Sequence, residues 1–277
     1  MKVVVMRTVV LAYLIPLLAA AWTGAAAAND APASDGPAMW RVADEDTEIV
    51  FLGTFHILPP GLEWRTATMN EKLSEADAIY FEVDTAAPDA ISKTRAVMET
   101  HGEFQDGGAL TETLSADDSN ALRDIVASLG LRFEGVNAMR PWNAFLTLSV
   151  QFILQQGFQP GSGVDTVLLM ESKIRGKDIR FFETIEQQLG FFTALPPDVE
   201  QRLLELTIRD WEKQTETFDD LVMAWRDGDI DFIDEEMNRL MRDVAPDAYD
   251  SLIADRNRAW ADELERALNE ETGVIFV

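Results

Sequence analysis

Short apolar runs alternate with longer amphipathic segments along most of the chain. Residues 49–52 (IVFL), 76–84 (ADAIYFEVD), 177–183 (KDIRFFE) and 273–277 (GVIFV) have the length and apolar content of strands. The first run is apolar at every position, which is typical of a central parallel strand covered on both faces. The segment before it, residues 39–48 (MWRVADEDTE), alternates and then turns polar, and it predicts a hairpin that opens the domain.

Helical spacing fills the intervals between these runs. Residues 63–77 separate the first two runs, so they predict a βαβ unit whose strands are parallel. Further helices are predicted over residues 115–129, after a Ser that can cap the helix, over 141–157, which begins with Pro, and over 163–175. Residues 184–270 predict a series of consecutive helices. This order predicts an α/β fold with a mainly parallel sheet flanked by helices.

The first 28 residues predict a secretory signal peptide rather than part of the fold. Lys2 and Arg7 precede an apolar segment that is too short to span a membrane, and small residues follow it up to a predicted cleavage site after Ala28. Residues 29–38 predict a linker. We therefore expect a periplasmic or secreted protein without an integral membrane segment after cleavage.

Charge and cysteine content exclude several classes of function. The chain has 49 acidic and 23 basic residues, a formal net charge of −26 that repels phosphate backbones, so no nucleic-acid partner is expected. It has no cysteine, which removes thiol nucleophiles and thiolate metal ligands. A metal site would have to use His, Asp or Glu.

Ionisable residues stand at the carboxyl ends of three predicted strands. His56 follows the first strand, Glu82 lies near the end of the second, and Glu183 ends the third. Parallel strands bring their carboxyl ends to one edge of a sheet, so these side chains converge if the strands are neighbours, which the spacing favours for the first two. One imidazole and two carboxylates suit a divalent metal such as zinc or manganese, or acid–base chemistry on water. Singly, each also has an ordinary structural interpretation as a hydrogen-bonded or ion-paired residue.

Other motifs are weaker. The acidic stretch 227–236 (DGDIDFIDEE) has its glycine misplaced for a calcium loop and predicts a helix N-terminus instead. Residues 159–165 (QPGSGVD) lack the lysine of a phosphate loop and the pattern of a nucleophile elbow. His101 lies in a polar stretch and is predicted to be a surface residue.

Several segments, in the same order, resemble the TraB/GumN family, relatives of the Tiki proteases. They are MWRVADEDTEIVFLGTFHILPPG with a G-x-x-H motif at Gly53–His56, EKLSEADAIYFEVD with Glu82, Pro141 with Trp142, GVD at 163–165, FETIEQQLGFFTALP at 182–196, and LIADRNRAWADEL with Arg256 and Asn257. The resemblance runs from about Trp40 to Val277 and implies one domain over residues 39–277. The implied fold is the α/β fold of the Tiki, erythromycin-esterase and ChaN type, with a large helical insertion.

The resemblance also implies chemistry. It implies a metal-dependent hydrolase or peptidase that uses manganese, cobalt or zinc, with His56 and Glu82 at the metal. The family carries a second G-x-x-H soon after a strand that resembles GVIFV, whereas this sequence ends at Val277. We therefore expect either a truncated C-terminus or a protein without the second histidine.

The leading hypothesis is an exported, metal-dependent hydrolase, peptidase-like, that acts on a peptide or small-molecule substrate. His56 and Glu82 would bind the metal or position its water, and Glu183 would serve as second carboxylate or base. Arg256, chosen on the resemblance and its charge, would clamp an anionic substrate or intermediate. Two alternatives stay open: a non-catalytic periplasmic protein that binds haem or an envelope glycan, and an accessory protein of polysaccharide export.

Overall fold

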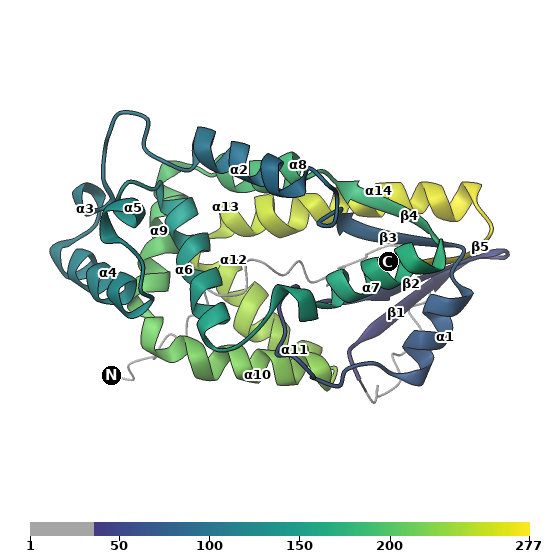
Figure 1. Cartoon of the computed structure of the whole chain (residues 1–277). Helices are drawn as coiled ribbons and strands as arrows, with labels where there is room; N and C mark the ends of the chain where they lie inside the picture. Colours follow the sequence, from purple (N-terminus) through teal and green to yellow (C-terminus); the bar gives the residue numbers. More distant parts are fainter. Residues whose placement is uncertain (1–35) are drawn as a thin grey trace.

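The structure, a computed structural model, describes residues 36–277 apart from the side chains of residues 214–216, 240 and 244. The predicted signal peptide (1–28), its cleavage site and most of the predicted linker (29–38) lie outside the described residues. In the described part of the chain, five strands form one sheet in the order β1-β2-β5-β3-β4 (Figure 1). They are β1 (Met39–Ala43), β2 (Thr47–Leu52), β3 (Ala78–Val83), β4 (Asp178–Glu183) and β5 (Gly273–Phe276).

Strand directions confirm the predicted α/β fold. β1 and β2 form the predicted antiparallel hairpin, and the pairs β2–β5, β5–β3 and β3–β4 are parallel. The expectation that the first two apolar runs are neighbours is wrong. β5 lies between β2 and β3, with Ile275 opposite Ile49 and Phe276 opposite Ile79. An apolar run shows that a segment is a buried strand, but it does not show which strand it pairs with.

Helices cover both faces of the sheet, which explains why the strands are apolar at consecutive positions. On one face, Ile49, Tyr80 and Ile275 pack against Leu264 and Ala267 of α14 (Asp255–Glu270). The opposite face packs against α1 (Ala67–Glu75) and α7 (Val164–Arg175) in the main core. The sheet is thus the middle layer of three.

A large helical region lies beyond the carboxyl ends of the parallel strands, on the left of Figure 1. Its first part, between β3 and α7, contains α2 (Ala90–His101), α3 (Leu110–Thr113), α4 (Ala116–Ser128), α5 (Phe133–Asn137) and α6 (Pro141–Gln155). Its second part, between β4 and α14, contains α8 (Ile185–Thr193), α9 (Pro197–Arg209), α10 (Gln214–Arg226), α11 (Ile230–Ile233), α12 (Leu240–Val244) and α13 (Pro246–Tyr249). The region has its own apolar core, to which Trp142, Phe145 and Leu203 contribute. The predicted helical segments are confirmed.

Local sequence signals fix where several helices begin. Thr184, directly after β4, caps α8: its hydroxyl accepts a hydrogen bond from the N–H of Gln187, whose side chain accepts one from the Thr184 N–H. Ser115 caps α4 as predicted, and Pro141 opens α6. Among the described residues, no helix is both long enough and apolar enough to cross a membrane.

Candidate functional site

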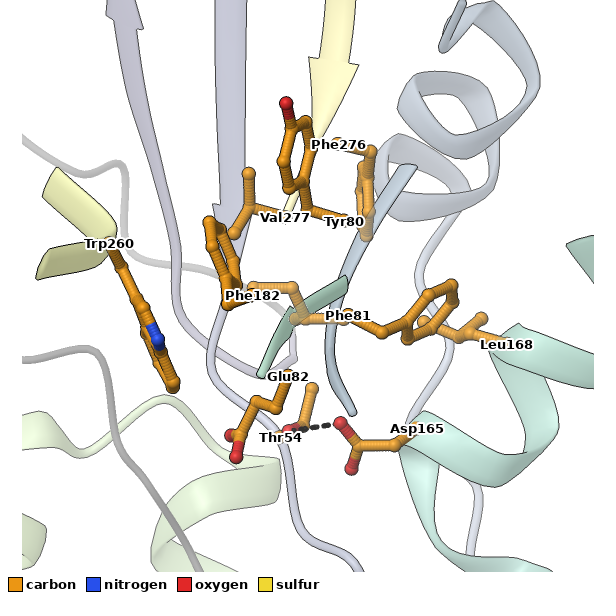
Figure 2. Close-up of a pocket in the computed structure, with 11 residues that line it drawn as sticks. Thr54, Tyr80, Phe81, Glu82, Asp165, Leu168, Phe182, Trp260, Phe276 and Val277 are labelled. Carbon is orange, nitrogen blue, oxygen red and sulfur yellow. Dashed lines mark hydrogen bonds between the residues drawn. The ribbon is translucent and has the colours of Figure 1, made fainter. Parts of the chain in front are cut away.

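A small cavity opens at the carboxyl edge of the sheet. Its volume of about 30 Å³ is enough for one or two water molecules. Its walls are mostly apolar, with Phe81 and Leu168 on one side and Phe182 and Trp260 on the other (Figure 2). Its polar end is formed by Thr54, Glu82 and Asp165. The cavity therefore lies where the sequence analysis placed the candidate site.

His56 lies in the loop after β2 and is held between two carboxylates. Its Nδ1 atom is 2.8 Å from Oδ2 of Asp165, and its Nε2 atom is 3.9 Å from Oε2 of Glu82. Asp165 is in the first turn of α7, and its Oδ1 accepts a hydrogen bond of 3.1 Å from the Thr54 hydroxyl. Asp165 thus fixes the side of the imidazole that faces away from Glu82.

The G-V-D segment explains how the His56 loop is attached to α7. A Cβ atom at Gly163 would lie 1.9 Å from the carbonyl oxygen of His56, so only glycine allows this close approach. The next residue, Val164, donates its backbone N–H to the carbonyl of Phe55 at 2.9 Å. Asp165 then reaches the imidazole. Three consecutive residues therefore position one histidine.

Glu82 and Glu183 lie on neighbouring strands and share one arginine. Arg256 of α14 donates to both oxygens of Glu183, at 2.7 and 2.8 Å, and from Nη2 to Oε2 of Glu82, at 3.2 Å. Trp260, one turn further along α14, donates its indole N–H to Glu183 at 3.1 Å. Gln188 of α8 donates to the same Oε2 of Glu82 at 3.1 Å. Both oxygens of Glu183 thus accept hydrogen bonds from α14, whereas only Oε2 of Glu82 accepts hydrogen bonds from Arg256 and Gln188.

The surroundings of the cluster raise the pKa of both facing groups, His56 and Glu82. Burial disfavours the charged imidazole, but Asp165 and Glu82 outweigh this effect and raise the pKa of His56 to about 9. Burial raises the pKa of Glu82 to about 7, against the attraction of His56 and Arg256 and with the repulsion of Asp165 and Glu183. Burial opposes ionisation of Asp165 too, yet the contact with His56 lowers its pKa. Between about pH 7 and 9, Glu82 is ionised and His56 is protonated.

The cluster does not have the ligands of a metal site as it stands. Among the side chains that the structure describes, no three of His, Asp or Glu are placed to hold one ion. His56 and Glu82 supply two ligands, and Oε2 of Glu82 already accepts hydrogen bonds from Arg256 and Gln188. Structural and catalytic zinc sites use at least three protein ligands. The divalent metal stays a prediction.

The structure brings together all four residues singled out from the sequence: His56, Glu82, Glu183 and Arg256. Asp165 was missed, although the G-V-D segment had been noted, because an Asp in the first turn of a helix is common for other reasons. His101 is exposed on α2, as predicted. In the acidic stretch 227–236, Asp229 caps α11, which confirms a helix N-terminus there.

The fold and the cluster define a class: an α/β protein with a buried ionisable site at the carboxyl edge of a mostly parallel sheet. Residues 38–277 match the TraB/PrgY/gumN family, and the chain belongs to that family. No curated protein and no solved structure matches the chain.

Proposed function

We propose that the cluster is a hydrolytic site in which Glu82 and His56 act as base and acid on either side of a bound water and a carbonyl substrate. One observation carries the proposal: the His56 imidazole lies between Asp165 and Glu82, at 2.8 and 3.9 Å, and these two carboxylates line a cavity large enough for water. The surroundings raise the pKa of both groups, to about 7 for Glu82 and to about 9 for His56, so between these values the carboxylate can accept a proton and the imidazolium can donate one.

The proton transfers follow from these protonation states. Ionised Glu82 takes a proton from water, and the resulting hydroxide oxygen attacks the substrate carbonyl carbon. When the bond from that carbon to the leaving nitrogen or oxygen breaks, the leaving atom takes the proton from Nε2 of His56. Glu82 then returns its proton to solvent, and His56 takes one up. The pKa of about 7 for Glu82 suits a base near neutral pH.

Asp165 and Glu183 act as positioning residues in this proposal. Asp165 holds the imidazole by Nδ1, so that Nε2 faces Glu82. Glu183 fixes the Arg256 fork with two hydrogen bonds, which leaves Nη2 beside Glu82. The positive charge of Arg256, held in this way beside Glu82, favours the negative charge that develops on a carbonyl oxygen during attack. We assign Glu183 this supporting role rather than that of a base, because Arg256 and Trp260 occupy its oxygens.

The test uses a panel of N-acetyl dipeptide p-nitroanilides and p-nitrophenyl acyl esters as substrates. We expect His56→Ala and Glu82→Gln each to lower kcat/KM by about 100-fold or more. The matched controls are His101→Ala and Glu99→Gln, two exposed residues of α2, which we expect to leave kcat/KM unchanged. No hydrolysis across the panel, or activity that survives both site substitutions, contradicts the proposal.

The predicted divalent metal is tested in the same assay. Activity that persists after extensive chelation supports acid–base hydrolysis by Glu82 and His56 alone. Activity that is lost with chelator and restored by manganese, cobalt or zinc, together with metal retained by the wild type and lost from His56→Ala, supports the metal-dependent form that the sequence predicts.

A further inference from the structure

A second cavity lies between α2 and α8, which run side by side beside the ends of β3 and β4 (Figure 1). Its volume is about 410 Å³, within the range of sites for small ligands, roughly 300–1,000 Å³. We call it the α2–α8 groove, and it is lined by Val83, Thr85, Ala90, Ile91, Thr94, Arg95, Ile185, Gln188 and Leu189.

The α2–α8 groove adjoins the candidate site through two of its lining residues. Gln188 lines the groove and also donates to Oε2 of Glu82 at 3.1 Å. Val83 follows Glu82 directly on β3. A ligand in the groove is therefore one side chain away from the proposed base. The ion pair of Lys93 and Glu186, at 3.7 Å, also joins the two helices that form the walls.

The lining of the groove is mostly apolar and carries one positive charge. Most of the lining residues are apolar, and Ile91 among them is 78 % exposed, so its side chain is free to contact a ligand. No lining residue is acidic, in a chain with 49 acidic and 23 basic residues. The single charged lining residue is Arg95, which is exposed and has no ion-pair partner within the described part of the chain.

We propose that the α2–α8 groove is the substrate subsite of the proposed hydrolase and binds the carboxyl-terminal end of a short peptide with apolar side chains. This rests on the proposed function, because it makes the groove the part of the site that holds substrate. The apolar wall takes a side chain, and Arg95 pairs with the free carboxylate. Thr85, Thr94 and Gln188 offer hydrogen bonds to amide groups, which an acyl chain would leave unused.

Binding is measured by calorimetry with three probes: N-acetyl-Leu-Leu with a free carboxylate, the same peptide as the C-terminal amide, and dodecanoate. The protein carries His56→Ala, so that the proposed chemistry is disabled while the groove is intact. We expect the free acid to bind more tightly than the amide. Arg95→Gln should weaken the acid by about fivefold and barely change the amide, because it removes one exposed ion pair.

One further variant tests the apolar wall of the groove, and another is the control for Arg95→Gln. Ile91→Ser should weaken both peptides, because it removes apolar contact, and the exposed position of Ile91 leaves the fold intact. Arg266→Gln is the matched control, an exposed arginine of α14 outside the groove lining, and should change neither affinity. No binding of either peptide, equal binding of acid and amide, or preference for dodecanoate overturns the proposal.

The subsite and the hydrolytic function can fail separately. If the acid binds with the expected dependence on Arg95 while the wild type hydrolyses nothing, the groove assignment stands and the proposed function is wrong. If the wild type hydrolyses the panel and Arg95→Gln leaves the binding of the free acid unchanged, the function stands and the groove assignment is wrong.

Discussion

Two buried groups of charges in this molecule have opposite designs. In the helical region, Glu200 of α9 pairs with Arg140, just before α6, and also accepts a weak hydrogen bond of 3.4 Å from the N–H of Trp142. At the edge of the sheet, Arg256 forms ion pairs with both Glu82 and Glu183, and His56 lies between Glu82 and Asp165. The first group matches one acid with one base. The second crowds three acids around one arginine and one histidine.

This difference distinguishes the Glu200–Arg140 pair, which has a structural role, from the cluster around Glu82, for which we propose a catalytic role. Burial raises the pKa of both Glu200 and Glu82, and in both cases an arginine opposes it. Only Glu82 is also repelled by neighbouring acids, Asp165 and Glu183, and only Glu82 faces an imidazole next to a cavity. In the proposed function the partly uncompensated Glu82 is the reactive carboxylate, whereas the matched pair of Glu200 and Arg140 only joins helices. The predictions below test this distinction.

The largest effect is expected at Arg256. Arg256→Met leaves Glu183 and Glu82 buried without their shared partner, so we expect the free energy of unfolding to fall by about 3–5 kcal/mol. Urea denaturation of the wild type and the variant measures it. Arg256→Lys keeps the charge but not the two-pronged geometry, and should lie between them. A loss below 1 kcal/mol for the methionine variant would show that the cluster is not buried as described.

The second effect is a dependence of stability on pH. The pKa of His56 is raised to about 9, so its ion pair stabilises the fold fully below about pH 6.5 and is lost as the pH rises through 9. The pKa of Glu82 is raised to about 7, so the cost of ionising it is absent below about pH 4.5 and complete above 7. Both effects make the protein less stable as the pH rises from about 5 to 9, each by an amount of the order of 3 kcal/mol.

Site variants assign the two parts of this pH curve. Glu82→Gln should flatten the part below about pH 7, and His56→Ala the part between about pH 6.5 and 9. His101→Ala and Glu99→Gln, the exposed controls, should keep the full slope. A wild-type stability that rises over the same range would contradict the assigned protonation states.

The third effect is expected at Gly163. Gly163→Ala places a methyl group against the His56 carbonyl, so we expect a loss of about 2–3 kcal/mol in unfolding free energy and a displaced imidazole. The control is Gly161→Ala in the same loop, where no atom lies within 4 Å of the added Cβ. Chemical shifts of the His56 ring, measured by NMR, should change in the first variant and not in the second.

The smallest effect is expected at the matched pair. Arg140→Met leaves Glu200 unpaired, but Arg140 is partly exposed and Glu200 can take up a proton, so we expect a loss of about 2 kcal/mol. Hydrolysis of the substrate panel should persist. If Arg140→Met abolishes kcat while the fold is retained, the division between the two charge groups is wrong.

The strands and the long helices could be predicted from the sequence, because each depends on local periodicity and on caps such as Ser115 and Thr184. The strand order could not, because β5 contacts β2 and β3 from more than 190 positions away. His56 and Glu82 were found because a polar residue after an apolar run is conspicuous. Asp165 and the α2–α8 groove were not, since both depend on how α7, α2 and α8 pack.

The position of β5 also makes the centre of the sheet depend on contacts between residues far apart in the sequence. Residues 273–276 supply the strand that joins the β1–β2 hairpin to the β3–β4 pair. Such distant pairing has a high contact order, and its loop-closure entropy must be overcome before the contacts form. The hairpin side carries His56 and the other side carries Glu82. The site is therefore assembled only when the two halves of the sheet are joined, so a folding intermediate without β5 would contain both residues and no site.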